Sequence, residues 1–207
     1  MSKASWQLRC AAIVAAVASC WSGALPLDRS AGEARAAEAP FYRLPLGART
    51  LRLGDRGADV KTLNWALRSE ALDAPYSGAF IDQTDAAVRS RQRSAGLQED
   101  GVVGRPTMKA IAAGMPRNRA SWYGPGLWGR RTACGVRLTK KTVGVAHRSL
   151  PCGTRVTLAY RGHWTRARVI DRGPYRKGYG LDLTRKLAAK LGVVAVGRAK
   201  VKIGVVP

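Results

Sequence analysis

Apolar residues recur at helical spacing through the first half of the chain. Val60, Leu63 and Leu67 lie on one face of a helix, and similar spacing continues over residues 84–95 and 108–113. Turns that contain glycine separate the three stretches. The pattern predicts a small all-α three-helix bundle.

Three residues with special backbone roles mark the ends of these predicted helices. Asp59 is placed to cap the first helix, because its side chain can accept a hydrogen bond from a free backbone N–H group. Gly96 is placed to end the second helix, and Pro106 to begin the third.

The second half of the chain alternates apolar and polar residues with a period of two. Strand-like runs cover residues 143–147, 154–160, 165–171 and 199–205, and one short helix is expected over 184–191. Short strands alone would leave exposed edges, and closing them into a barrel protects those edges. We therefore expect a mainly-β barrel domain with a short helix.

The first 24 residues have the composition of an export signal. A basic start precedes an apolar stretch over residues 10–20, which is too short to span a bilayer with ease, and Ser22–Ala24 forms a small-residue cleavage site. A lipidated Cys20, a later cut at residues 34–36 and an uncleaved anchor are the alternatives. The first interpretation places the protein outside the cytoplasm.

The changes in pattern divide the chain into segments. We expect a signal peptide over residues 1–24 and a linker over 25–40, followed by a helical domain over 41–115. A second short linker over 116–119 leads to the barrel domain, residues 120–207.

Positive charge is concentrated in the second domain. Residues 41–115 contain 11 Lys/Arg and 8 Asp/Glu, whereas residues 116–207 contain 21 Lys/Arg and only 2 Asp. Such a field attracts polyanions, although it could also serve solubility alone. Nucleic acid is the obvious polyanion, but an export signal argues against it. Anionic polymers of the cell wall are the expected partners.

Cys134 and Cys152 are the two cysteines that lie outside the signal segment. In an oxidising compartment such a pair predicts a disulfide, and closing this loop of 18 residues would stabilise the fold by about 3 kcal/mol. Zinc binding is the weaker alternative, because two cysteines and two dispersed histidines lack the spacing of a zinc finger. We expect neither a metal nor an organic cofactor.

The helical domain resembles the three-helix type of peptidoglycan-binding domain. The residues that carry the resemblance occur in order as LGDRGADVKTL (53–63), GAF (78–80), TDAAV (84–88), GL (96–97) and DGVVGRPT (100–107). One departure is Arg91-Gln92, where the family usually has an aromatic residue before the glutamine. The resemblance implies binding to the wall, and four side chains could line a shallow groove: Trp65, Tyr76, Phe80 and Gln92. The alternative is that these side chains belong to the core.

The barrel domain resembles the rare lipoprotein A-like (RlpA-like) family, whose fold is a double-psi β-barrel shared with expansins. The matching segments are ASWYG (120–124), RTACG (131–135), VAHRSLPCGTRV (145–156), VIDRGPY (169–175) and LDLT (181–184). The resemblance implies lytic transglycosylase activity, which some members of the family have. The histidine of the third segment and the aspartate of the fourth are essential to that activity. These positions correspond to His147 and Asp171. A glutamate that many members carry is replaced here by Val136.

Cleavage of a glycosidic bond needs a proton donor at the leaving oxygen. A lytic transglycosylase can work with one carboxylate, because the C6 hydroxyl of the muramyl sugar is the nucleophile. The barrel domain has two carboxylate side chains, Asp171 and Asp182. Asp171 should emerge at the barrel rim, where burial would raise its pKa for acid work while Arg172 opposes that shift. The alternative for Asp171 is a turn-forming aspartate.

The remaining candidates surround these carboxylates. Asp182 precedes the short helix and is a plausible cap as well as a substrate-binding residue. His147 could orient Asp171 or bind a sugar hydroxyl, and Arg172 is a further candidate for binding the substrate. Tyr123 and Tyr175 could stack on sugar rings, because aromatic faces pack against them.

Taken together, the sequence predicts a secreted or lipid-anchored protein of the cell envelope, acting as a monomer on peptidoglycan. Its first domain would hold the wall, and its second would cleave glycan strands to 1,6-anhydro-muramyl ends. The alternative function is a non-catalytic, expansin-like protein that binds or loosens the wall.

Overall fold

The computed structural model describes residues 45–207, which fall within one compact unit. The predicted signal peptide over 1–24, the possible lipidation site at Cys20 and the linker over 25–40 lie outside the described residues. Within the described part, no helix is both long enough and apolar enough to cross a bilayer.

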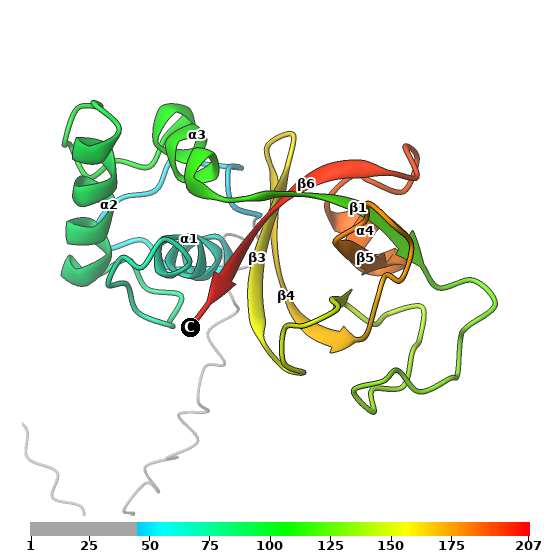
Figure 1. The fold of residues 1–207 in the computed structure, drawn as a ribbon. Coiled ribbons are helices and arrows are strands. Elements are labelled where there is room, and N and C mark those ends of the chain that lie inside the picture. Colours follow the sequence, from blue (N-terminus) through cyan, green and yellow to red (C-terminus); the bar gives the residue numbers. More distant parts are fainter. Residues whose placement is uncertain (1–44) are drawn as a thin grey trace, which may run out of the picture. The chain divides into compact units, whose positions relative to one another are not determined.

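Three helices form the first half of the described chain, close to the predicted positions (Figure 1): α1 (Ala58–Arg68), α2 (Asp82–Ser94) and α3 (Arg105–Gly114). Two short antiparallel β-bridges, Leu51–Val103 and Arg56–Ala79, tie the connecting segments together. The region is therefore helical, but the all-α description holds only in part.

The prediction that Asp59 caps α1 is wrong. The cap position is Gly57, which makes no side-chain cap bond, and Asp59 lies inside the helix with its side chain buried. Its carboxylate accepts a hydrogen bond from Arg49 Nε at 2.7 Å, because a buried charge needs a partner of opposite sign. The residue therefore fixes the segment before α1.

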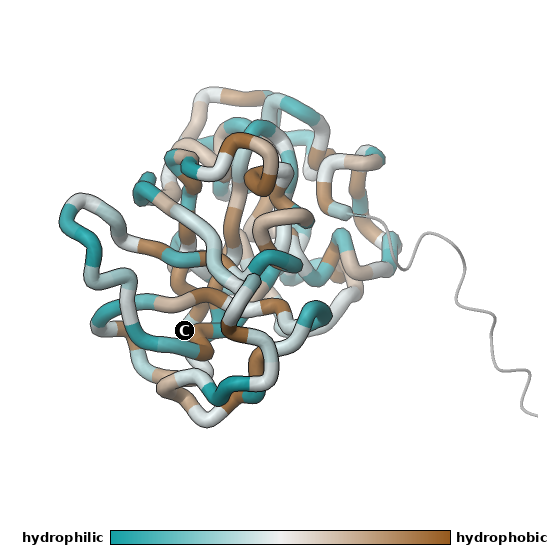
Figure 2. The backbone as a smooth tube through the Cα atoms, turned by 90° about the vertical axis from the view of Figure 1, so that its right-hand side faces the viewer, coloured by the Kyte–Doolittle hydropathy of each residue, from teal (hydrophilic) through white to brown (hydrophobic). Residues whose placement is uncertain are grey.

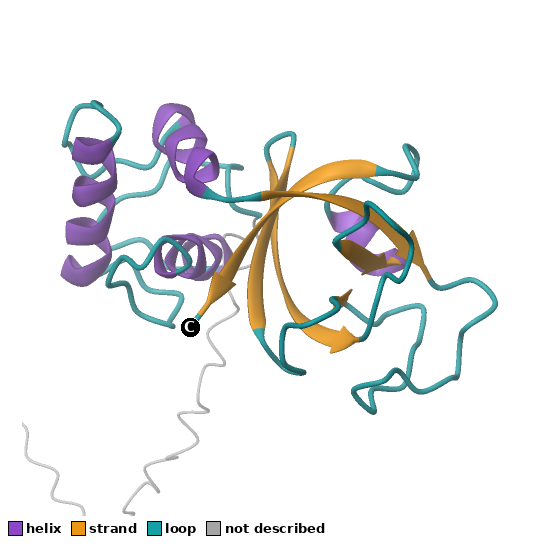
Figure 3. Cartoon of the chain, viewed as in Figure 1, coloured by secondary structure: helices purple, strands orange, loops and turns teal. Residues whose placement is uncertain are grey.

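Six strands of the second half form a closed barrel in the order β1-β5-β2-β4-β3-β6 (Figures 1 and 3). The strands are β1 (Arg117–Tyr123), β2 (Val145–Ala146), β3 (Arg155–Tyr160), β4 (His163–Asp171), β5 (Leu181–Thr184) and β6 (Ala199–Val206). A fourth helix, α4 (Arg185–Lys190), follows β5. The predicted closure is confirmed, and this architecture is consistent with a double-psi barrel.

The predicted linker over residues 116–119 is wrong for its last three residues. Arg117, Asn118 and Arg119 form the start of β1, where they pair antiparallel with β6. Their side chains are polar and show no alternation with apolar residues, so the sequence did not predict this strand. Its pairing with β6 closes the barrel.

Each half of the structure has its own buried core, and the barrel also contributes to the core of the helical half. Ala159 of β3 and Trp164 of β4 pack in the same cluster as helical residues such as Leu63 and Ile111. Figure 2 shows hydrophobic and hydrophilic residues alternating at short intervals along the chain, as expected for short amphipathic elements. The shared cluster joins the two halves through burial of apolar surface.

Candidate active site

The two-residue strand β2 brings the two carboxylates of the barrel domain together. Ala146 of β2 lies opposite Asp171 of β4 on one side and opposite Asp182 of β5 on the other. On the far side of β5, Ser121 of β1 lies opposite Asp182. Strands β1, β5 and β4 thus place the side chains of Ser121, Asp182 and Asp171 close to one another around β2.

A register shift between β2 and β4 directs Asp171 to this location. Val145 pairs with Val169, but the next residue, Ala146, pairs with Asp171, so that Ile170 is skipped. Simple alternation would leave Asp171 on the same face as Val169, which belongs to the barrel core. The extra residue changes the direction of the side chain, a known effect of a β-bulge.

Asp171 is oriented by two backbone amides. Its Oδ1 accepts hydrogen bonds from Ala133 N at 2.9 Å and Arg172 N at 2.8 Å. The bond to Arg172 joins adjacent residues, whereas the bond to Ala133 comes from the long loop between β1 and β2 (Figure 3). The sequence did not predict the role of Ala133, because this role depends on the backbone N–H group and not on the type of side chain.

Asp182 is the carboxyl of the site whose pKa is raised. Its pKa is about 6, because burial and the charge of Asp171 raise it more than hydrogen bonds from Ser121 and from the Leu183 backbone lower it. Its Oδ1 is buried and has no hydrogen-bond partner among the described residues. This carboxyl is therefore the one best placed to hold a proton near neutral pH.

The prediction that Asp182 caps the short helix is wrong. It lies inside β5, and the cap of α4 is Thr184, whose side chain accepts a hydrogen bond from Leu187 N. The cap position is displaced because residues 181–184 form a strand that the sequence analysis did not predict. Asp182 is thereby free for a role in the site.

Tyr123, at the end of β1, adds a neutral hydroxyl beside both carboxylates. Burial raises the pKa of Tyr123, and the charges of Asp171 and Asp182 raise it further. The phenol therefore keeps its proton, because ionisation would place a third negative charge in a partly buried site.

His147 follows β2 and is held by the turn after it. Its Nδ1 accepts hydrogen bonds from Ser149 N at 3.3 Å and Leu150 N at 3.1 Å. Burial, together with the nearby Arg172 guanidinium, lowers the pKa of His147. The ring is thus neutral with its proton on Nε2, which leaves one N–H group to donate to a ligand.

Asp171 and His147 are neighbours through the backbone. The His147 N–H group donates to the Asp171 carbonyl at 3.2 Å, and the Arg172 guanidinium donates to the Leu150 carbonyl at 2.9 Å. Arg172, predicted to bind substrate, therefore stabilises the turn whose backbone amides donate to His147. Orientation of the Asp171 carboxylate comes from Ala133 and Arg172 amides.

The predicted disulfide between Cys134 and Cys152 is confirmed. Cys134 follows Ala133, which donates to Asp171, and Cys152 follows the turn whose amides donate to His147. The bond therefore joins the two loops that orient the two candidate catalytic side chains.

Two further predicted positions are exposed. Tyr175 has 82% of its surface accessible, so its ring is open to a ligand, and Val136 has 37% accessible. No carboxylate of the barrel domain other than Asp171 and Asp182 is available to replace the glutamate expected at Val136. Among residues 45–207, no group of three His, Cys, Asp or Glu side chains is arranged to hold a metal ion.

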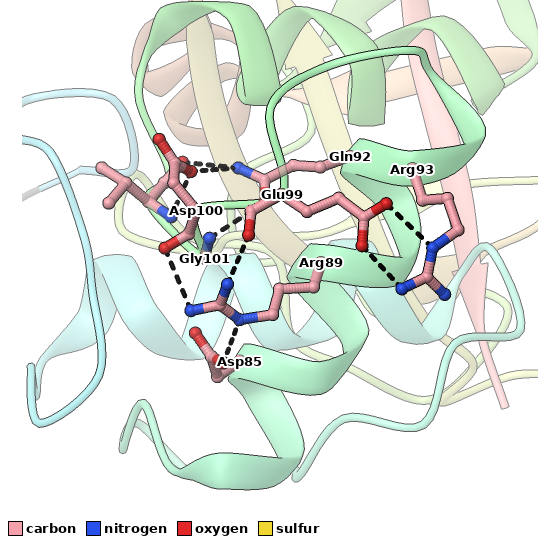
Figure 4. A network of polar contacts seen from close by, with 8 residues as sticks. Asp85, Arg89, Gln92, Arg93, Glu99, Asp100 and Gly101 are labelled. Carbon is pink, nitrogen blue, oxygen red and sulfur yellow. Dashed lines mark hydrogen bonds and ion pairs between the residues drawn. The ribbon is translucent and has the colours of Figure 1, made fainter.

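The four residues predicted to form a wall-binding groove are not brought together as a groove. Phe80 is 1% exposed and lies in the core. Gln92 is 2% exposed, and Figure 4 shows its side chain directed at the loop of Asp100 and Gly101. Its Nε2 donates to Asp100 Oδ1 at 2.7 Å, and its Oε1 accepts from Gly101 N at 3.0 Å. For these two residues the core alternative holds.

Trp65 and Tyr76 face the barrel. The Trp65 ring lies beside the guanidinium groups of Arg155 and Arg166, 6.0 and 5.3 Å from its centre. The Tyr76 ring lies 5.0 Å from Arg155, and its hydroxyl donates to the Pro207 carbonyl. These cation–π contacts join the two halves of the structure.

Comparison with known proteins identifies both domains. Residues 116–203 match the family model described as lytic transglycolase, and residues 56–111 match that of a peptidoglycan binding domain. The chain therefore combines a peptidoglycan-binding domain with an RlpA-like double-psi β-barrel domain.

Several curated relatives match a part of this chain. The endolytic peptidoglycan transglycosylase RlpA of Neisseria meningitidis serogroup A is 36% identical over 124 residues, 58% of this chain and 52% of the relative. The probable endolytic peptidoglycan transglycosylase RlpA of Synechocystis sp. is 41% identical over 102 residues, 48% of this chain and 30% of the relative. The alignments thus span between about a third and a half of the length of these relatives.

Replacing both disulfide cysteines by alanine should lower the free energy of unfolding by about 3 kcal/mol. It should also lower the turnover of any glycan cleavage by the folded protein, because the loops that orient Asp171 and His147 are then no longer joined. Denaturant unfolding and product formation well below the transition measure the two effects. The control is Leu67→Ala in the helical core, which should lose stability and keep turnover. Free thiols at both cysteines in the native protein would contradict the account.

Asp182→Asn should stabilise the protein at pH 7, by an amount on the order of 2 kcal/mol. The folded pKa of about 6 lies above the ordinary value of 3.8, so wild-type stability falls as the pH rises between these values. The increase in the free energy of unfolding that asparagine brings should be present above pH 6 and absent below pH 3.8. Unfolding curves across this range measure it, and a loss of stability at pH 7 would contradict the raised pKa of Asp182.

Proposed function

We propose that the protein is a secreted cell-wall enzyme that cleaves peptidoglycan glycan strands without water, leaving 1,6-anhydro-muramyl ends. The observation that carries the proposal is the pair Asp171 and Asp182 on adjacent positions around β2, one of which has its pKa raised to about 6. The names of the curated relatives and the matched barrel family support the same reaction.

The sequence predicts Asp171 as the acid, but burial raises the pKa of Asp182, so in this reaction we assign Asp182 as the acid and Asp171 as the base. The Asp182 carboxyl donates its proton to the glycosidic oxygen as the bond from that oxygen to C1 of the muramyl sugar breaks. The C6 hydroxyl of the same sugar forms the new bond to C1 and releases its proton to the Asp171 carboxylate. The proton count is balanced, and the pair is reset when a proton returns from Asp171 to Asp182.

Three neighbouring side chains support this exchange. The Tyr123 hydroxyl keeps its proton, because burial and the charges of both carboxylates raise its pKa, and it remains a neutral group beside the pair. His147 donates a hydrogen bond from its Nε2–H group to a sugar hydroxyl, since its Nδ1 already accepts from Ser149 N and Leu150 N. Tyr175, which is exposed beside the site, offers its ring to a sugar face.

The other parts of the chain complete the proposal. Residues 1–24 direct export, with lipidation at Cys20 as the alternative, and residues 41–115 hold the wall while residues 120–207 carry the reaction. The protein then acts as a monomer in the cell envelope, on peptidoglycan and other anionic wall polymers. The positive charge of the barrel domain favours such partners.

A non-catalytic function in wall binding or loosening is the second candidate. Its specific support is Val136, which stands where many relatives of this type carry a glutamate. Mass spectrometry of purified sacculi after incubation distinguishes the two functions, because cleavage alone releases anhydro-muramyl fragments.

Asp171→Asn should reduce the turnover of glycan cleavage by at least about 100-fold, with wall binding retained. Asparagine keeps an oxygen that can accept from Ala133 N and Arg172 N, but it cannot take up a proton. Loss of the charge should also lower the pKa of Asp182. The matched control is Asp73→Asn, an exposed carboxylate of the helical domain. Full activity in a folded Asp171→Asn protein would remove Asp171 from the reaction.

His147→Asn separates the two roles open to the histidine. Asparagine can replace Nδ1 as the acceptor for Ser149 N and Leu150 N, but it lacks the Nε2 proton. We expect stability close to wild type and a turnover reduced by about tenfold or more, as in His147→Ala. Recovery of wild-type turnover in the asparagine variant would show that the residue only holds its turn.

A further inference from the structure

A second groove lies away from the carboxylates, between the helical half and the barrel. It has a volume of about 970 Å³ and is lined by residues 47–50 and 103–112 of the helical half. The barrel contributes the turn over residues 159–164 and the side chains of Arg117, Lys200 and Lys202. Both halves of the described chain therefore form its walls.

The charged residues that line this groove are all basic. Seven lysine and arginine side chains line it, and no aspartate or glutamate does: Arg49, Arg105, Lys109, Arg117, Arg161, Lys200 and Lys202. Arg49 is paired with Asp55 and Asp59. Five of the others are exposed and form no ion pair with a carboxylate of residues 45–207: Arg105, Lys109, Arg117, Arg161 and Lys200.

Folding brings some of these cations against one another. Arg117 of β1 and Lys202 of β6 are paired in register across the strands that close the barrel. Burial lowers the pKa of Lys202, and the charge of Arg117 lowers it further, while Glu70 acts in the opposite direction. Like charges opposite each other destabilise a sheet, so an anion in the groove would relieve their repulsion.

The groove is separate from the candidate active site. His163 at the start of β4 lines the groove, whereas Asp171 is at the end of the same strand. A strand rises by about 3.3 Å per residue, which puts the two ends roughly 25 Å apart. One ligand group cannot occupy both sites, but an extended polymer can reach from one to the other.

We propose that this groove binds the carboxylates of peptidoglycan stem peptides. The helical domain, which matches a peptidoglycan-binding family over residues 56–111, supplies residues 103–112 of the groove. Stem peptides repeat along a glycan strand and carry free carboxylates, which complement a groove with several unpaired cations and no acidic residue. The inference rests on the substrate class of the proposed function, but it does not require that the strand be cleaved.

The test is a triple variant of the full-length protein, Arg105→Gln, Lys109→Gln and Arg161→Gln. The control, Arg185→Gln, Lys186→Gln and Arg198→Gln, removes the same charge from exposed positions outside the groove. Co-sedimentation is measured with intact peptidoglycan, with peptidoglycan whose carboxyls have been converted to amides, and with amidase-stripped glycan. All preparations are freed of phosphate-containing polymers.

The groove variant should bind intact peptidoglycan about tenfold more weakly than wild type, and the control variant should bind as wild type does. On amidated and on stripped material the groove variant and wild type should bind equally. Equal losses in both variants, no loss in the groove variant, or an equal loss on stripped glycan would each overturn the proposal. So would a groove effect that appears only when a phosphodiester polymer is added.

Cleavage of stripped strands by wild type is followed in parallel. Its absence would overturn the proposed reaction and leave the binding comparison unaffected. The two proposals can therefore fail separately.

Discussion

The pairing of β2 with both β4 and β5 is the constraint on which the candidate site depends. The strand has two residues, Val145 and Ala146, and its parallel pairing with β4 contains a register shift. That shift places Asp171 opposite Ala146, and the antiparallel pairing with β5 places Asp182 opposite the same residue. Two carboxylates come together in this way although ten residues separate them in the sequence.

Their closeness explains the unusual electrostatics of the site. The charge of one carboxylate makes ionisation of its neighbours less favourable, and burial acts in the same direction at Asp182 and Tyr123. Backbone amides fix Asp171, and the disulfide joins the loop that provides one of them to the turn that fixes His147. Asp171 and His147 are thus held by loops that the disulfide joins, whereas Asp182 and Tyr123 are partly buried on the barrel strands β5 and β1.

Much of the architecture could be predicted from the sequence. The three helices of the first domain have apolar residues at helical spacing, and the disulfide follows from a single cysteine pair in a domain that the sequence predicts to be exported. The sequences of β3, β4 and β6 alternate apolar and polar residues over several positions, although four consecutive residues of β3 are buried. These elements are recognisable because the pattern of residue types lies within a short local segment.

The parts of the structure that could not be predicted depend on contacts between residues that are far apart in the sequence. Strand β5 has only four residues and β1 begins with polar ones, so neither shows a clear period. For this reason the sequence wrongly predicts Asp182 as a helix cap. Its raised pKa arises from burial among strands that are far apart in the sequence and meet only in the folded barrel. Trp65 and Tyr76 are predicted to face the wall, but both rings lie beside arginines of the barrel, where Trp65 is buried and Tyr76 stays 40% exposed.

The central claim is that the two carboxylates cleave glycan strands with the sugar's own C6 hydroxyl as nucleophile. Incubation of peptidoglycan with the protein in ¹⁸O-labelled water tests it most directly, followed by mass spectrometry of the released fragments. The account predicts new muramyl ends that have lost the mass of one water and contain no ¹⁸O. Fragments with ¹⁸O at a new reducing end, or no released fragments, would contradict it.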